Sequence, residues 1–295
     1  MPHPYLCYFM VYQTGTTTNI EMLIQYFHRY PLWILLITQL LLFGCSISSP
    51  DTFYRHARDM GLQRELVNTT ALPLIVYSTP GPHNSDQLHV YLGGDGLPWR
   101  NLITISNDPS PRSPQVLRFM QKDPQPAIFL GRPCYQGLAQ TPPCDYIHWT
   151  AGRFSKAIAG SMSNALQQII KRRSISRVTL IGYSGGGALA ILLAHHIKQT
   201  TTVVTIAGTL DTDAWARHHN YSPLNESINP ATLPPLPEHI KQIHLQGKRD
   251  KNIPPHITNA FILRQHKPEV ILYPQANHDC CWLKHWPAIV RRLRH

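Results

Sequence analysis

Three polar residues in the second half of the chain have the types and the order that nucleophilic chemistry needs. Ser184 lies in the Gly-x-Ser-x-Gly sequence at 182–186, Asp250 follows it, and His278 comes last. A serine hydroxyl is a weak nucleophile until a neighbouring base takes its proton, and histidine changes charge near neutral pH. A carboxylate can hold the imidazole in the correct tautomer. These residues predict attack on a carbonyl carbon by Ser184, with His278 as base and Asp250 as its partner.

The segment around Ser184 predicts a sharp turn that presents the serine. The apolar, β-branched segment 178–181 indicates a strand, and the Ala/Leu-rich segment 188–199 indicates a helix. A serine between such a strand and helix stands on a nucleophile elbow, with its hydroxyl exposed above the sheet. Gly182 and Gly186 are expected because the turn brings backbone segments together, where a Cβ atom would clash.

The acid and the base are also expected just after strands. The alternating segment 240–246 predicts a strand, after which Asp250 lies in a turn closed by Pro254. A further strand is expected at 269–273, followed by His278 and a terminal helix. Asp211, which follows the apparent strand 203–207, is an alternative candidate for the acid.

From about Leu74 to its C-terminus the chain resembles the α/β-hydrolases, which carry Ser, Asp and His in this order. Asp250 is similar to the family's acid after the seventh strand, and His278 to its histidine after the eighth. The resemblance implies an α/β-hydrolase fold and a serine hydrolase that cleaves an ester or thioester through an acyl-enzyme. Two alternatives stay open: acyl transfer to an alcohol acceptor, and a non-catalytic envelope protein that uses the same fold for binding or as a scaffold.

Acyl transfer also needs two N–H donors directed at the developing oxyanion. Gly185, the residue after the nucleophile, is expected to supply one. The strand expected at 88–92 runs into the glycine-rich segment 93–96, which resembles an esterase oxyanion loop, so Gly94 or Asp95 is expected to supply the other. The alternative is a plain tight turn.

Three residues are candidates for substrate contact: Tyr183 beside the nucleophile, Arg132 after the strand expected at 127–130, and Trp215. Arg132 would bind a carboxylate or phosphate, or would instead brace a loop carbonyl. Trp215 belongs to the proline-rich segment 209–238, which is either a small cap over the pocket or an ordinary surface excursion.

The expected strands alternate with helical segments, including 153–173 and 188–199. This alternation predicts an α/β fold with a mostly parallel sheet and helices on both faces. The chain is divided accordingly into a leader (1–45), a tether and entry segment (46–70) and a catalytic domain (71–295). The strands are expected at 74–78, 88–92, 127–130, 178–181, 203–207, 240–246 and 269–273.

The leader contains a short apolar segment, 32–43, of a length typical of a signal peptide, and ends in Leu42-Phe43-Gly44-Cys45. This sequence resembles the bacterial lipoprotein box, which implies lipidation of Cys45 and a periplasm-facing place at the outer membrane. An uncleaved anchor and ordinary secretion are the alternatives. Cys134 and Cys144 flank a short loop and are expected to form a disulfide in this oxidising compartment.

Composition and motif content limit which partners and cofactors are expected. The net charge of +11 is spread in short clusters without interleaved aromatic residues, which predicts a solvated surface and no nucleic-acid partner. No phosphate-binding loop, dinucleotide fingerprint or metal-ligand spacing is present in the sequence, so neither a cofactor nor a metal is expected. The expected partners are a small-molecule or lipid ester as substrate, and a membrane through the lipid anchor.

Overall fold

The computed structural model describes residues 51–81, 85–101 and 103–293. Within these ranges eight strands form one sheet, and helices lie between most of the strands. The elements are α3 (Asp51–Asp59), β1 (Gln63–Val67), β2 (Leu74–Ser78), β3 (Gln87–Leu92), α4 (Gln115–Gln121), β4 (Ala127–Leu130), η1 (Tyr146–Trp149), α5 (Lys156–Arg173), β5 (Arg177–Tyr183), α6 (Gly185–Ala194), β6 (Thr200–Ile206), α7 (Thr212–His218), η2 (Pro230–Thr232), β7 (Lys241–Gly247), α8 (Pro255–Ile262), β8 (Glu269–Tyr273) and α9 (Trp282–Arg292).

The sheet has the strand order β1-β2-β4-β3-β5-β6-β7-β8. The pairs β1–β2 and β2–β4 are antiparallel, and every pair from β4–β3 to β7–β8 is parallel. Parallel strands need helical crossovers that cover both faces, which explains why most of β5 and the second half of β3 are apolar. The carboxyl ends of β3 to β8 therefore meet at one edge of the sheet, where a ligand site is expected.

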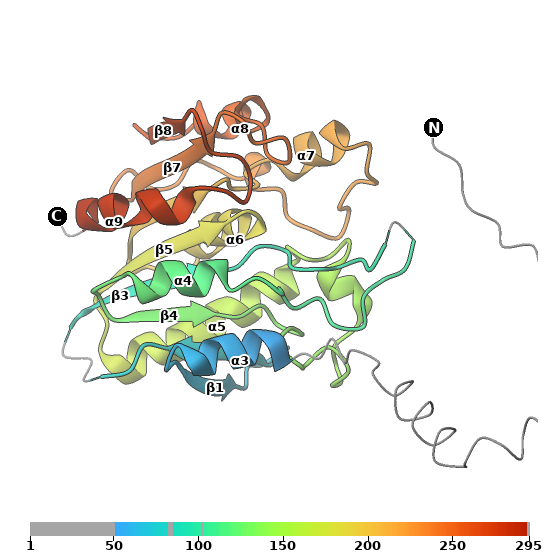
Figure 1. Cartoon of the computed structure of the whole chain (residues 1–295), viewed down its shortest axis with the longest axis vertical. Helices are drawn as coiled ribbons and strands as arrows, with labels where there is room; N and C mark the ends of the chain where they lie inside the picture. The colour runs from blue at the N-terminus through green and yellow to red at the C-terminus, as the bar shows by residue number, and fades with distance from the viewer. Residues whose placement is uncertain (1–50, 82–84, 102, 294–295) are drawn as a thin grey trace, which may run out of the picture. The chain divides into compact units, whose positions relative to one another are not determined.

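Helices cover both faces and separate the core into two layers. Residues of α3, α4 and α9 pack with one face, whereas residues of α5, α6 and α8 pack with the other. Figure 1 shows α3, α4 and α9 in front of the sheet and α5 and α6 behind it. All ten residues of α6 are buried, so the helix that follows Ser184 lies inside the second layer, between the sheet and α5.

The seven predicted strands are present, with bounds that differ by at most three residues, and the predicted α/β fold is confirmed. The entry segment differs from the expectation. It contributes α3 and also β1, which pairs along its whole length with β2, so the sheet begins before the predicted domain boundary at residue 71. β1 lies at the sheet's edge, and most of its side chains are solvent-accessible; its sequence therefore lacks the apolar alternation that indicates a strand.

The predicted leader and the lipidation of Cys45 lie outside the described residues. Within the described ranges, none of the helices has the length and apolar character needed to cross a membrane.

Candidate active site

Ser184 occupies a sharp turn between β5 and α6. Its backbone has φ 52° and ψ −123°, a conformation that non-glycine residues rarely adopt and that persists only where the surroundings impose it. Both predicted glycines are needed by close backbone contacts. A Cβ on Gly182 would lie 2.1 Å from the Gly186 carbonyl oxygen, and one on Gly186 would lie 2.2 Å from the Leu92 carbonyl oxygen.

A continuous chain of hydrogen bonds joins Ser184, His278 and Asp250. Ser184 Oγ lies 3.0 Å from His278 Nε2, and His278 Nδ1 lies 2.9 Å from Asp250 Oδ2. A carboxylate accepts hydrogen bonds only, so Nδ1 donates to Asp250 and Nε2 faces the serine hydroxyl. This is the arrangement in which an imidazole can accept the serine proton.

The carboxylate of Asp250, which ends this series of hydrogen bonds, is held in place and shielded from solvent. The Asp250 side chain is fully buried, and its second oxygen, Oδ1, accepts from the backbone N–H groups of Asn252 and Ile253, both at 2.8 Å. Asp211, the alternative acid, has a different role: its Oδ1 caps α7 by accepting from the N–H groups of Asp213 and Ala214. The geometry therefore favours Asp250.

The loop that carries His278 is held from both sides by aromatic donors. The His278 carbonyl oxygen accepts from the Tyr183 hydroxyl at 3.0 Å and from Trp282 Nε1 at 2.8 Å. Tyr183 also donates to Asp279 Oδ1 at 3.0 Å. Burial, together with the Asp279 carboxylate, raises the pKa of Tyr183 well above its usual value, so the phenol remains a donor. Trp282 was not predicted for the site, and nothing in its sequence context marks it.

The glycine-rich loop after β3 lies beside the nucleophile. A Cβ on Gly94 would lie 3.3 Å from Ser184 Cβ. In the described part of the chain, the N–H groups of Gly94, Asp95 and Gly185 donate no hydrogen bond to another protein group. Gly94 and Gly185 thus lie beside Ser184, and no acceptor for their N–H groups is found among the described residues.

Asp95 projects its carboxylate between two arginines. Arg132 Nη2 lies 2.7 Å from Asp95 Oδ1, and Arg153 Nη1 lies 2.8 Å from Asp95 Oδ2. Burial by itself would raise the pKa of the Asp95 carboxyl, but the two guanidinium groups outweigh it and hold that pKa below its usual value. Arg132 does not line the pocket, because its side chain is 3% exposed and lies behind Asp95. The expectation that it contacts substrate is therefore replaced by its alternative, a bracing role.

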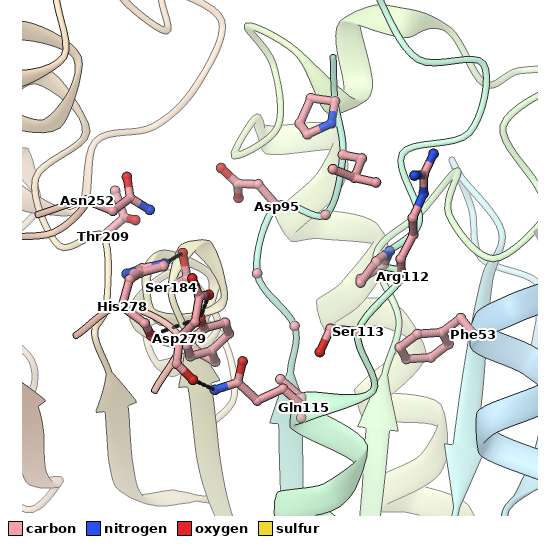
Figure 2. A pocket seen from close by; sticks show the side chains of 18 of the residues that line it. Phe53, Asp95, Arg112, Ser113, Gln115, Ser184, Thr209, Asn252, His278 and Asp279 are labelled. Atoms are coloured by element: carbon pink, nitrogen blue, oxygen red, sulfur yellow. Dashed lines mark hydrogen bonds between the residues drawn. The ribbon is translucent and has the colours of Figure 1, made fainter. Parts of the chain in front are cut away.

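A pocket of about 870 Å³ opens over Ser184 and His278. Figure 2 shows Ser184, His278 and Asp279 at one end and Phe53, Arg112 and Ser113 across from them. Many of the lining side chains are apolar or aromatic, including Phe53, Leu97, Val116, Phe129, Trp215 and Leu283. Most come from loops or short elements far from the triad in sequence, which explains why sequence reasoning missed them.

The remaining candidates for substrate contact also reach this pocket. Tyr183 and Trp215 line it, and Trp215 Nε1 donates to Asn252 Oδ1 at 3.2 Å. The segment 209–238, proposed as a cap, contains α7 and η2 and supplies Thr209 and Trp215 to the pocket. Tyr221 packs against Trp215 but does not line the pocket, and it is 52% exposed.

Cysteines form two links near the site. Cys134 and Cys144 are joined by a disulfide, and so are the adjacent residues Cys280 and Cys281. The second link lies where Cys281, at φ 82°, turns the chain into α9. In the described ranges, no group of three or more His, Cys, Asp or Glu residues is arranged to hold a metal ion.

Sheet order, helical layers and the Ser184 turn together define the α/β-hydrolase fold. No protein-family model and no curated protein sequence matches the chain. Solved structures do match. An esterase from Pyrococcus furiosus aligns with a TM-score of 0.57 at 14% identity, over 80% of this chain and 91% of the esterase. Mouse alpha/beta hydrolase domain-containing protein 10 aligns with a TM-score of 0.54 at 12% identity, over 78% and 98%. An alpha-beta serine hydrolase homologue from Coxiella burnetii gives 0.52 at 13%, over 79% and 97%.

Proposed function

We propose that this protein is a serine hydrolase that cleaves a carboxylic ester or thioester. The observation that carries the proposal is the hydrogen-bonded series from buried Asp250 through His278 to Ser184, which borders a pocket. Beside it lie backbone N–H groups for which the described residues supply no acceptor. A scaffold has no physical need for these three residue types in this arrangement. The resemblance in fold to an esterase and to serine hydrolases agrees with the proposal.

The geometry supports a two-stage reaction. His278 Nε2 accepts the hydroxyl proton as Ser184 Oγ bonds to the substrate carbonyl carbon, and the carbonyl oxygen takes up negative charge. The N–H groups of Gly185 and of Gly94 or Asp95 stabilise that oxyanion. His278 then donates the proton to the leaving alcohol or thiol, which leaves an acyl-serine. Water, deprotonated by His278, attacks the acyl carbon and releases the carboxylic acid and free Ser184.

Pocket chemistry supports an ester with an apolar part. Phe53, Val116, Phe129 and Leu283 form an apolar wall, and the pocket volume lies in the range of sites for small organic ligands. Apolar burial stabilises a bound chain by about 0.8 kcal/mol per methylene. An acyl chain of several carbons on this wall would therefore gain substantial binding energy.

Hydrolysis of p-nitrophenyl esters from C2 to C16 tests the proposal. Ser184→Ala is expected to lower kcat by ~10⁴-fold or more, because it removes the nucleophile. Ser222→Ala, at an exposed position, is the matched control and should leave the rate unchanged. A fluorophosphonate probe should label the wild type and not Ser184→Ala. Failure of the folded wild type both to react with the probe and to cleave any ester would favour a non-catalytic binding protein.

Product analysis separates hydrolysis from acyl transfer. When an alcohol acceptor is added, a hydrolase should still release mainly the free acid, because water resolves the acyl-serine. Predominant formation of the acceptor's ester would show that the same acyl-enzyme serves a transferase.

A further inference from the structure

Asp95 and its two arginines form a largely buried cluster in contact with the proposed oxyanion donors. The Asp95 side chain is 20% exposed, and those of Arg132 and Arg153 are 3% and 8% exposed. Taking three charged groups out of water is costly, and such clusters are poor evidence for stability. Their attested use is to specify one arrangement of the groups around them.

Each arginine is tied to the rigid body of the fold by further donors. Arg132 Nη1 donates to the Arg153 carbonyl oxygen at 3.4 Å, and Arg153 Nε donates to the Thr150 carbonyl oxygen at 2.7 Å. Arg132 also lies over the rings of Tyr135 and Phe154, with its guanidinium carbon 5.8 and 5.2 Å from the ring centroids. Asp95 is therefore bonded to two side chains that have little freedom of their own.

The backbone of Asp95 is held as well. The Tyr135 hydroxyl donates to the Asp95 carbonyl oxygen at 2.9 Å. Tyr135 and Arg132 both belong to the loop after β4, and the disulfide between Cys134 and Cys144 closes that loop. The loop closed by this disulfide thus makes two contacts with Asp95: Tyr135 bonds its carbonyl oxygen and Arg132 bonds its carboxylate. The turn before α5 makes the third contact, from Arg153 to the carboxylate.

The cluster touches the nucleophile turn directly. A Cβ on Gly185 would lie 1.8 Å from Asp95 Oδ1 and 2.7 Å from Arg132 Nη2, so the ion pair packs against the Gly185 backbone. Gly94, the residue before Asp95, lies against Ser184. The Asp95 carboxylate therefore contacts Gly185 directly and lies one residue from Gly94, the two residues whose N–H groups have no acceptor among the described residues. The glycine-rich loop alone, with three glycines in four residues, would not hold them.

We propose that Asp95, Arg132 and Arg153 are positioning residues that set the N–H groups of Gly94 and Gly185 in register for the oxyanion of the reaction. The proposal rests on the proposed hydrolase function. Arg153 lines the pocket, whereas Arg132 does not, but the hydrogen bonds of both arginines are directed at Asp95 and at backbone carbonyls. The proposal therefore assigns both arginines to the geometry of the donors and not to binding of an anionic substrate. A misplaced donor weakens the transition state more than the ground state, so kcat should fall while KM changes little.

The test compares Asp95→Asn and Arg153→Lys with Glu65→Gln. Glu65 pairs with Arg172 at 2.7 and 2.8 Å on the surface between β1 and α5, so its variant also removes one charge from an arginine pair. Each protein is assayed with an oxygen ester and with the matching thionoester, whose carbonyl sulfur is a poorer hydrogen-bond acceptor. Loss of N–H donation lowers the rate with the oxygen ester most. The oxygen-to-sulfur rate ratio therefore reports the donors and is insensitive to the fraction of folded enzyme.

Asp95→Asn is expected to lower kcat by ~100-fold with little change in KM, and to lower the oxygen-to-sulfur ratio by ~10-fold. Arg153→Lys keeps the charge but cannot reproduce the pair of bonds from Arg153 to Asp95 and to the Thr150 carbonyl oxygen, so it should show a smaller change in the same direction. It tests the proposal if Asp95→Asn does not fold. Glu65→Gln should leave all three quantities unchanged. An unchanged ratio in both folded site variants would overturn the inference, even if kcat fell. Absence of Ser184-dependent turnover in the wild type would instead count against the proposed function.

Discussion

At the scale of single residues, the proposed reaction depends on how few positions His278 can take. Its ring is bonded at both nitrogens, and its carbonyl oxygen accepts from Tyr183 and Trp282. Pre-organisation of this kind matters because a misplaced catalytic group loses much of its effect. Asp250 contributes orientation and charge, and the backbone N–H groups of Asn252 and Ile253 hold its carboxylate in place.

Asp250→Asn is expected to lower kcat by ~10⁴-fold, because an amide can donate to Nδ1 and so favour the wrong tautomer of His278. The amide oxygen can still accept from the backbone, so folding should persist. Steady-state kinetics together with thermal unfolding measures both effects. Asp211→Asn is the matched control: asparagine is as good an N-cap as aspartate, so activity should be retained. The opposite pattern, in which the Asp211 variant is inactive and the Asp250 variant active, would assign the acid to Asp211.

At the scale of elements, the site is assembled from loops that follow β3, β5, β7 and β8. β3 and β5 are neighbours in the sheet, which brings Gly94 next to Ser184. β7 and β8 are also neighbours, which brings Asp250 next to His278. The sheet thus fixes the pairs, and loop contacts such as the one from Asp95 to Arg153 complete the arrangement.

The disulfide between Cys134 and Cys144 is expected to stabilise the loop between β4 and η1. Replacing both cysteines with alanine should lower the free energy of unfolding by ~2–3 kcal/mol, because a closed loop this short removes that much freedom from the unfolded chain. Urea unfolding without reductant measures the change. Equal stability of the variant and the wild type would contradict the expected role of the link.

His244 joins β6 and β7 through a hydrogen bond of 2.8 Å to Thr205 Oγ1. Burial lowers the pKa of His244 to about 4, so between that value and its usual value the unfolded state binds a proton that the native state does not. Stability therefore rises with pH in this window, and acidification from pH 6.5 towards 4 should cost up to ~1.4 kcal/mol per unit. Unfolding measured across this range should show a smaller slope in His244→Asn; an identical slope would refute the contribution of His244.

At the scale of the whole molecule, the leader predicted at 1–45 lies outside the described residues. We propose that Cys45 is lipidated and that the protein faces the periplasm at the outer membrane. Lipid attachment supplies binding energy in proportion to the buried methylenes, and stable anchoring takes more than one chain.

Expression of the full chain in a bacterium with labelled fatty acid tests the anchor. The wild type should carry label and sediment with membranes, whereas Cys45→Ser should carry none. Cys7→Ser is the matched control and should behave as the wild type. Equal labelling of the wild type and Cys45→Ser, or absence of label from both, would contradict lipidation at this residue.

Much of the fold and the triad follows from local patterns in the sequence. Central strands are buried on both faces and read as apolar runs, and the Ser184 turn needs glycines at fixed positions. The edge strand β1 was not predicted, because its mostly exposed residues do not form an apolar run. Ser184, Asp250 and His278 could be predicted as a triad because each follows a strand that the sequence pattern indicates.

Tertiary structure alone decided which charged groups meet. Asp95 and Arg153 are 58 residues apart, and no periodicity connects them. Arg153 was recognised only as the beginning of a helical segment, and Arg132 had two roles left open. Local sequence determines which element forms, because helix and strand propensity act over a few residues. The partners of a charged side chain depend instead on how distant loops pack. Only the folded chain therefore places Asp95 between its arginines and against Gly185.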